Sequence, residues 1–166
     1  MTAASCPFCT IEASRIFHAG DMVLGVWDAC PVSPGHALLI PRRHIATWFD
    51  ATHQERAELA ETVGIARCAI ERRHQPDGFN IGVNVGAAAG QTIPHLHVHV
   101  IPRYAGDVPN PRGGVRYVIP AHANYPASSE RDAPLTRDAG GVLATSSILA
   151  GMTGDSQRYA RRLAMG

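Results

Sequence analysis

Residues 95–101 read His95-Leu-His-Val-His-Val-Ile101, and this stretch carries the strongest structural signal in the chain. Side chains of a β-strand alternate between its two faces, so the pattern predicts that His95, His97 and His99 point one way and the apolar residues the other. At about 3.3 Å per residue, the first and third imidazoles lie roughly 13 Å apart. Because zinc–nitrogen bonds are only about 2.0–2.1 Å long, one metal ion cannot bind all three. The spacing favours an extended substrate, with one histidine at the reacting atom and a neighbour on each side.

A loop of small and polar residues precedes these histidines. Gly86 and Gly90 allow backbone N–H groups to approach a ligand closely, as they do in anion-binding nests. Gln91 and Thr92 add uncharged donors, and Asn84 ends the predicted strand before the loop. Hydrogen-bond donors directed at an anion, beside an imidazole nucleophile, suit attack at phosphorus.

Hydropathy and turn residues predict an α+β fold. A Thr-x-x-Glu capping box at residues 52–55 and apolar residues at helical spacing predict one helix over residues 53–73. Strand-like runs in neighbouring pairs predict an antiparallel sheet that this helix covers on one face. The predicted strands span residues 15–18, 22–27, 36–41, 79–84 and 96–101, with a further short strand over 115–120.

Composition excludes several classes of function. All 15 basic residues are arginine, so a lysine Schiff base and a phosphate-binding Walker lysine are both ruled out. With 14 acidic residues the formal charge is only +1, which indicates neither a nucleic acid nor a membrane surface as partner. The first residues show no basic start followed by an apolar run, so we expect a cytoplasmic protein.

The composition changes along the chain and predicts two regions. Residues 1–120 carry all the motifs described above, whereas residues 121–166 are dominated by Ala, Ser, Gly and Arg. We expect the second region to be a partly ordered C-terminal extension, with a weak helix around residues 156–164 and no function that the sequence reveals.

The motifs together resemble the histidine triad (HIT) superfamily of nucleotide hydrolases and transferases. Residues 90–101, which include the three alternating histidines, resemble its signature, and upstream matches follow in the expected order at Asp28, residues 33–36 and residues 40–44. The continuation over residues 102–107 is most similar to the bacterial and fragile-histidine-triad-like branch of dinucleoside polyphosphate hydrolases. The resemblance covers about residues 4–108 and implies a five-stranded antiparallel sheet with one long helix, paired in a two-fold homodimer.

The resemblance also implies a role for each catalytic residue. His97, the middle histidine, would attack the α-phosphorus of a dinucleoside polyphosphate or related AMP conjugate and form a covalent nucleotidyl-histidine, later hydrolysed by water. His99 would contact the phosphate or the bridging oxygen. Gln91 would lie near the leaving group and the attacking water. His36 matches a fourth histidine of the family, which supports the row from behind.

Substrate-binding residues follow from the same resemblance. Asp28 would accept both ribose hydroxyls of an adenosine nucleotide, while Asn84, Gly90 and Thr92 would hold the α-phosphate together with Gln91 and His99. Other activities share this nucleophile, so a nucleoside phosphoramidase and a nucleotidylyl transferase or phosphorylase stay open. So do a nucleotide-binding module without catalysis and a metal-dependent hydrolase that uses His95 and His97.

The pair Cys6 and Cys9 allows three interpretations. A redox dithiol would normally follow a first strand and open a helix, but only five residues precede Cys6. The second interpretation is a pair of buried thiols. The third is a zinc site, which needs two further ligands. Part of the HIT family carries a structural zinc, and the resemblance implies that His44 and His95 complete that set; no organic cofactor is expected.

Overall fold

The structure is a computed structural model that describes residues 5–124, 136–137 and 143–144. The chain divides into two units, Met1–Asn124 and Tyr125–Gly166. In the second unit, strands β6 (Thr136–Arg137) and β7 (Leu143–Ala144) pair antiparallel. The helix expected around residues 156–164 lies outside the described residues. Across the described part of the chain, no helix has the length and apolar character needed to cross a membrane.

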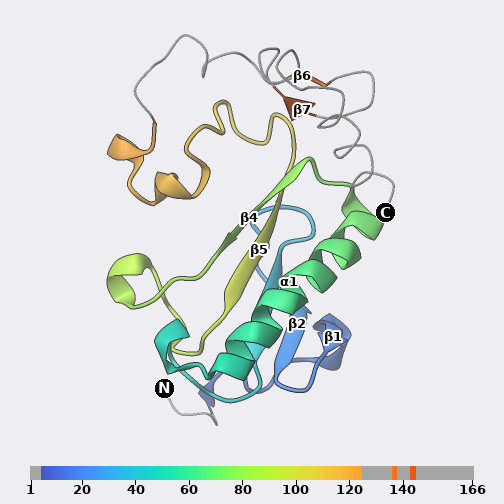
Figure 1. Cartoon of the computed structure of the whole chain (residues 1–166), viewed down its shortest axis with the longest axis vertical. Helices are drawn as coiled ribbons and strands as arrows, with labels where there is room; N and C mark the ends of the chain where they lie inside the picture. Colours follow the sequence, from blue (N-terminus) through green and yellow to red (C-terminus); the bar gives the residue numbers. More distant parts are fainter. Residues whose placement is uncertain (1–4, 125–135, 138–142, 145–166) are drawn as a thin grey trace. The chain divides into compact units, whose positions relative to one another are not determined.

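The first unit is built on a five-stranded antiparallel sheet, as predicted (Figure 1). Its spatial order is β1-β2-β3-β5-β4, so β5 lies between β3 and β4, and β4 forms one edge. The strands are β1 (Ile16–Ala19), β2 (Val23–Trp27), β3 (Ala37–Pro41), β4 (Gly78–Gly82) and β5 (Val98–Arg103).

Strand β5 begins and ends two residues later than predicted. Before it, the N–H of Leu96 donates to the carbonyl of Ile45 at 2.7 Å, so His95 and His97 lie in an irregular approach to the strand. At its other end, pairing with β3 stops at Val100. Pro102 can therefore continue the strand, because no ladder bond is needed from its missing N–H on that side.

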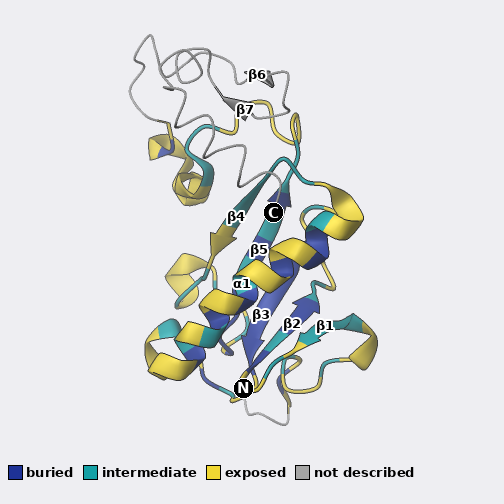
Figure 2. Ribbon diagram, turned by 45° about the vertical axis from the view of Figure 1, so that its right-hand side comes forward, coloured by how far each residue is buried: buried dark blue, intermediate teal, exposed yellow. Residues whose placement is uncertain are grey.

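The single long helix α1 (His53–His74) confirms the predicted one. Its first turn is closed by a capping box in which Thr52 and Glu55 bond each other's backbone N–H groups. The buried residues Leu59, Ala66 and Ile70 face the sheet, and α1 lies across one face of it (Figure 2). This face of the sheet is apolar, which leaves the opposite face for the site.

The sheet separates two apolar clusters. Val98 and Val100 of β5 pack in the larger cluster beneath α1. On the opposite face, Leu38 packs with Val26 and Ile40 and with the N-terminal segment around Phe8. His99 pairs with Leu38 across the sheet, so its side chain belongs to the face away from the helix. The predicted alternation is therefore confirmed for Val98, His99 and Val100, whereas His95 and His97 precede the strand that was predicted to contain them.

The prediction of a short strand over residues 115–120 is wrong. The segment forms two 3₁₀ turns, η5 (Gly114–Val118) and η6 (Pro120–His122). Gly113 and Gly114 both have positive φ, which starts the turn, and the N–H groups of Arg116 and Ile119 bond carbonyls three residues back. The positive φ angles of the two glycines and the presence of Pro120 outweigh the preference of the β-branched residues for a strand.

An ion pair between Arg43 and Glu55 ties the end of β3 to the start of α1. The Arg43 guanidinium donates to both carboxylate oxygens, at 2.9 and 2.8 Å, and this contact lowers the pKa of the buried Glu55 from 4.5 to about 2. A lowered folded-state pKa means that the contribution is present above pH 4.5 and disappears as the pH falls towards 2.

We predict that Glu55→Gln lowers the free energy of unfolding by about 2 kcal/mol at pH 7. The deficit relative to the unchanged protein should shrink in urea titrations at pH 3, because Glu55 then loses part of its charge-dependent stabilisation. Glu61→Gln, on the exposed side of α1, is the matched control. A deficit independent of pH would contradict this role of the carboxylate.

Candidate functional site

Two cysteines and two histidines meet beside the end of β3. The Nδ1 atom of His95 lies 3.4 Å from Sγ of Cys6 and 3.6 Å from Sγ of Cys9, and Nδ1 of His44 lies 3.2 Å from Sγ of Cys9. All four donor atoms lie within 4.8 Å of one another, so these residues could hold a metal ion.

The donor set fits zinc in both chemistry and spacing. Zinc–sulfur bonds of about 2.3 Å and zinc–nitrogen bonds of about 2.0–2.1 Å at tetrahedral angles separate the two ligand atoms by about 3.5 Å. His95 is fully buried, and its other nitrogen, Nε2, lies 2.8 Å from the carbonyl of Pro41. This hydrogen bond leaves the lone pair of Nδ1 directed at the cysteines, as outer contacts of metal-binding histidines do.

His97 is held in one orientation by the backbone. Its Nδ1 atom lies 2.8 Å from the carbonyl oxygen of His95. A carbonyl can only accept, so Nδ1 carries the proton and Nε2 keeps its lone pair. The ring of Phe8 packs edge-on against His97 at 5.0 Å between centroids and also contacts His95 at 6.1 Å. His97 is thus buried, and in its neutral form Nε2 is the nitrogen with the lone pair.

Sequence reasoning missed Phe8 and the two backbone acceptors. The signal for Phe8 was its place between Cys6 and Cys9, which brings its ring to the first two histidines once the cysteines approach His95. The carbonyls of Pro41 and His95 carry no sequence signal, because every residue has a carbonyl group.

His99 links His97 to a chain of polar groups in which His36 is buried and Asp28 is half-buried. The rings of His97 and His99 meet edge-on, 5.0 Å apart. Nδ1 of His99 lies 3.1 Å from Nε2 of His36, whose Nδ1 lies 3.1 Å from a carboxylate oxygen of Asp28. Burial lowers the pKa of His99 to about 4, with further lowering from His97 and His36, so it is neutral at pH 7. Burial also lowers the pKa of His36, and the charge of Asp28 partly offsets this.

The glycine loop has the open geometry that the sequence predicts. Gly86 and Gly90 have φ of 81° and 85°, on either side of the 3₁₀ turn η4 (Ala87–Ala89), and open space surrounds both. The Gln91 side chain closes the loop: its oxygen accepts from the N–H of Gly86 at 2.8 Å, and its nitrogen donates to the carbonyls of Ala46 and Ile93. Both the oxygen and the nitrogen of the Gln91 side-chain amide are therefore hydrogen-bonded to the backbone.

The predicted phosphate-binding residues Asn84 and Thr92 lie on either side of this loop and differ in how far they are buried. Asn84 lies two residues beyond the end of β4, so it does not end that strand as predicted. It is half-buried, whereas Thr92 is exposed just after Gln91. The structure groups the other predicted site residues into two clusters, namely the four metal-binding candidates and the set Asp28, His36, His97 and His99.

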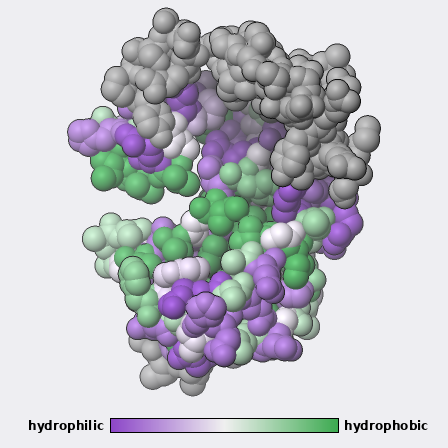
Figure 3. Space-filling view, viewed as in Figure 1, coloured by the Kyte–Doolittle hydropathy of each residue, from purple (hydrophilic) through white to green (hydrophobic). Residues whose placement is uncertain are grey.

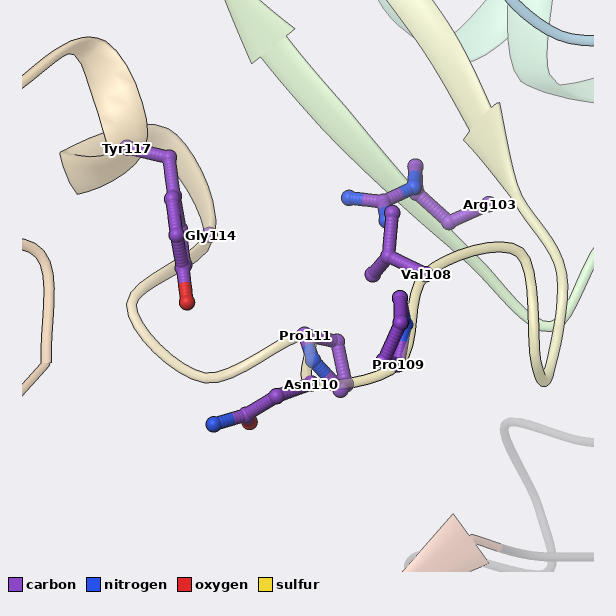
Figure 4. A pocket seen from close by; sticks show the side chains of 7 residues that line it. All are labelled: Arg103, Val108, Pro109, Asn110, Pro111, Gly114 and Tyr117. Atoms are coloured by element: carbon purple, nitrogen blue, oxygen red, sulfur yellow. The ribbon is translucent and has the colours of Figure 1, made fainter. Parts of the chain in front are cut away.

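A separate cavity of about 470 Å³ lies beyond the end of β5 (Figure 4). Its lining holds none of the predicted site residues: it consists of Arg103, Val108, Pro109, Asn110, Pro111, Gly114 and Tyr117. The Arg103 guanidinium is already bonded to the Asp107 carboxylate and to Asn80. We therefore place the candidate site at the histidines and not at this cavity.

Comparison with known proteins finds nucleotide-cleaving enzymes. The chain is 38% identical over 97 residues to an AP-4-A phosphorylase of Mycobacterium tuberculosis. The matched region covers 58% of this chain and 50% of that protein. It is 36% identical over 94 residues to an asymmetrical bis(5'-nucleosyl)-tetraphosphatase of Schizosaccharomyces pombe, with 57% and 52% covered. The chain spans about half the length of these curated relatives.

Solved structures share the fold. A zinc-bound histidine triad family protein from Mycobacterium smegmatis matches with a TM-score of 0.57 at 34% identity, over 72% of this chain and 94% of that one. A hypothetical histidine triad nucleotide-binding protein from Sulfolobus tokodaii matches with a TM-score of 0.57 at 35% identity, over 63% and 73%. Residues 10–106 match the family model of the HIT domain, so the chain belongs to the HIT family.

Proposed function

We propose that this chain is a nucleotide hydrolase that cleaves dinucleoside polyphosphates or related AMP conjugates at the α-phosphate, with His97 as the nucleophile. One observation carries the proposal: the hydrogen bond from Nδ1 of His97 to the carbonyl of His95, which leaves the lone pair of Nε2 free. Membership of the HIT family and the names of the curated relatives support the substrate class.

The chemistry runs in two displacement steps. In the first, the lone pair of His97 Nε2 attacks the α-phosphorus, a phosphorus–nitrogen bond forms, and the bond to the bridging oxygen breaks with its electrons on the leaving phosphate. In the second, the oxygen of a water molecule attacks phosphorus, and the electron pair of the phosphorus–nitrogen bond returns to Nε2. Division into two steps lowers each barrier, and fixed donors around the phosphate supply the charge stabilisation.

The remaining predicted residues are assigned to the substrate. We assign the α-phosphate to Asn84, Thr92, the Gly90 backbone and His99, and the ribose hydroxyls to Asp28. The open space around Gly86 and Gly90 supports close approach of an anion to the loop. Gln91 keeps the loop in shape through its amide and is assigned to the side of the leaving group. We assign His36 to supporting the His99 ring, because Nε2 of His36 contacts Nδ1 of His99.

Phosphorolysis is a second candidate, because one relative is named AP-4-A phosphorylase. The covalent intermediate would be the same, with inorganic phosphate in place of water in the second step, so added phosphate would raise the rate and appear in the product. A nucleoside phosphoramidase would share the intermediate and differ in its leaving group. A binding module without catalysis would turn over no phosphoanhydride or phosphoramidate.

We propose that Cys6, Cys9, His44 and His95 hold a structural zinc ion. The spacing of their donor atoms and the zinc-bound family structure support this assignment. The ion would anchor the segment that presents His97 and take no part in either displacement step. Thiols that serve as ligands must stay reduced, which supports a cytoplasmic location for the chain.

We also propose a homodimer that forms through the open edge of β4. Among the described residues β4 pairs only with β5, which leaves its other side as an edge, and Ile81 of β4 is exposed. Figure 3 shows hydrophobic surface beside a hollow on this face of the molecule. Val115, Val118 and Ile119, in the segment that forms η5 and η6, are also exposed. Light scattering should give about twice the chain mass of 17.7 kDa, and the mass of one chain would contradict the proposal.

We predict that His97→Ala lowers the rate of diadenosine tetraphosphate cleavage by at least about three decades, because removal of a covalent nucleophile typically costs that much. His53→Ala, at the exposed start of α1, is the matched control and should keep the full rate. A His97→Ala rate within about tenfold of the unchanged protein would refute the assignment.

We predict roughly one zinc ion per chain in metal analysis of the purified protein, with most of it lost in Cys6→Ser. Cys30→Ser is the control, because Cys30 is an exposed cysteine outside the set. Equal zinc in the unchanged protein and in Cys6→Ser would eliminate the site. Loss of activity on chelation in a protein that stays folded would instead favour a metal-dependent hydrolase.

A further inference from the structure

Two of the metal-binding candidates, Cys6 and Cys9, lie at the two ends of one turn. The N–H of Cys9 donates to the carbonyl of Cys6 at 3.0 Å, which closes a β-turn over residues 6–9. The Cα atoms at the ends of such a turn lie less than about 7 Å apart, and a disulfide spans about 4.4–6.8 Å. The two Sγ atoms also belong to the set of donor atoms that lie within 4.8 Å of one another. The backbone of this turn therefore suits a disulfide between the pair.

The two thiols differ in their access to solvent. Cys6 is buried, with 1% of its surface exposed, whereas Cys9 is exposed. A soluble oxidant therefore reaches Cys9 first and finds Cys6 beside it as a second thiol. An accessible cysteine next to a resolving cysteine is the arrangement of redox-sensitive pairs. Cys30 and Cys68 are exposed as well, but neither belongs to the donor set.

The pair reaches the proposed nucleophile by two routes. Nδ1 of His95 lies 3.4 Å from Sγ of Cys6 and 3.6 Å from Sγ of Cys9. The carbonyl of the same residue, His95, accepts from Nδ1 of His97 at 2.8 Å. The second route is Phe8, which lies between the two cysteines and packs its ring edge-on against His97 at 5.0 Å. A rearrangement of the turn is therefore felt at the His97 ring on two sides.

The segment that carries His95 and His97 has little support from strand pairing. It precedes β5, and its backbone is tied to the neighbouring chain by the bond from the N–H of Leu96 to the carbonyl of Ile45. The His95 ring is held by the carbonyl of Pro41 on one nitrogen and by the cysteines on the other. Loss of the sulfur contacts therefore removes one of the two polar anchors of this ring.

We propose that Cys6 and Cys9 form a thiol switch, in which a hydroperoxide joins them in a disulfide that removes two of the four metal ligands and releases the His95 ring on that side. The inference rests on the proposed zinc site and the proposed nucleophile, and it adds a regulated state to both. The reduced pair holds His97 in its working orientation, and the oxidised pair does not.

The oxidation balances with hydrogen peroxide as the oxidant. The Cys9 thiolate attacks one peroxide oxygen, the oxygen–oxygen bond breaks, and hydroxide leaves, which gives a sulfenic acid at Cys9. The Cys6 thiolate then attacks Sγ of Cys9, the sulfur–sulfur bond forms, the sulfur–oxygen bond breaks, and a second hydroxide leaves. Both hydroxides take a proton from solvent and become water. The pair has then lost two electrons to the peroxide.

The role of the pair as metal ligands supplies the thiolates for this reaction. The thiolate is the form of cysteine that attacks an oxidant, and cysteines that bind a metal are deprotonated. Without a metal, burial and the neighbouring Cys6 raise the pKa of the Cys9 thiol, so that thiol is protonated at pH 7. The switch therefore operates in the zinc-loaded protein.

Peroxide treatment of the zinc-loaded double variant Cys30→Ser/Cys68→Ser tests the switch, because Cys6 and Cys9 are then its only cysteines. The peptide that contains both should lose two hydrogen atoms, and zinc should pass to a chelating dye with the same time course. Cleavage of diadenosine tetraphosphate should fall about tenfold or more, because a displacement of about 1 Å at a reacting group can cost about 100-fold. A thiol reductant followed by zinc should restore the rate.

Cys6→Ser in the same double variant is the matched control for the second thiol. It keeps the exposed Cys9 but has no cysteine that can resolve a sulfenic acid. Peroxide should therefore carry Cys9 on to the sulfinic acid, which a thiol reductant does not reverse. Sulfinic acid at Cys9 as the main product while Cys6 is present would refute the switch.

A readout independent of catalysis tests the link to the nucleophile. The ¹H–¹⁵N ring signals of His97 should shift when the disulfide forms and return on reduction with zinc. A disulfide that leaves these signals unchanged and the cleavage rate within about twofold would contradict the link. A reduced protein that binds no zinc would overturn the proposal together with the zinc site. If neither form cleaves a nucleotide, the proposed function fails, while the peptide mass, the zinc release and the His97 signals still decide the switch.

Discussion

The hydrogen bond between Nδ1 of His97 and the carbonyl of His95 is the constraint on which the site depends. It determines which ring nitrogen keeps a lone pair, and it does so with a backbone group two residues away. The carbonyl is itself held in place because the His95 ring is fully buried between the cysteines and Pro41. Orientation of the proposed nucleophile therefore starts at the candidate metal site and passes through one residue of backbone.

The fold explains why the reactive side chains collect on one face of the sheet. Helix α1 covers the opposite face and buries Val98 and Val100, so the alternating residue His99 must point away from it. Strand β3 lies beside β5 and brings the residues just before it, including His36, to the same place. The proposed metal anchor His95, the proposed nucleophile His97 and the neighbouring His99 then all come from five consecutive residues.

Local patterns predicted much of this arrangement. The capping box at Thr52 and the helical spacing of Leu59 and Ile70 located α1 within a residue, because both signals are local. Alternation along β5 was also readable, but its start was not, since the N–H of Leu96 bonds the distant Ile45. The chain from Asp28 to His99 joins residues 71 positions apart, and no local pattern reports such a contact. Residues 115–120 were misread because the φ angles of two glycines outweighed β-branched side chains.

The most direct test of the account is mass spectrometry of the full chain after brief incubation with diadenosine tetraphosphate and acid-free quenching, which preserves phosphorus–nitrogen bonds. The account predicts an added adenylyl group on a peptide that contains residues 95–99, with fragmentation that places it on His97. An adenylyl group on another residue, or rapid turnover with no covalent adduct at any time, would contradict it.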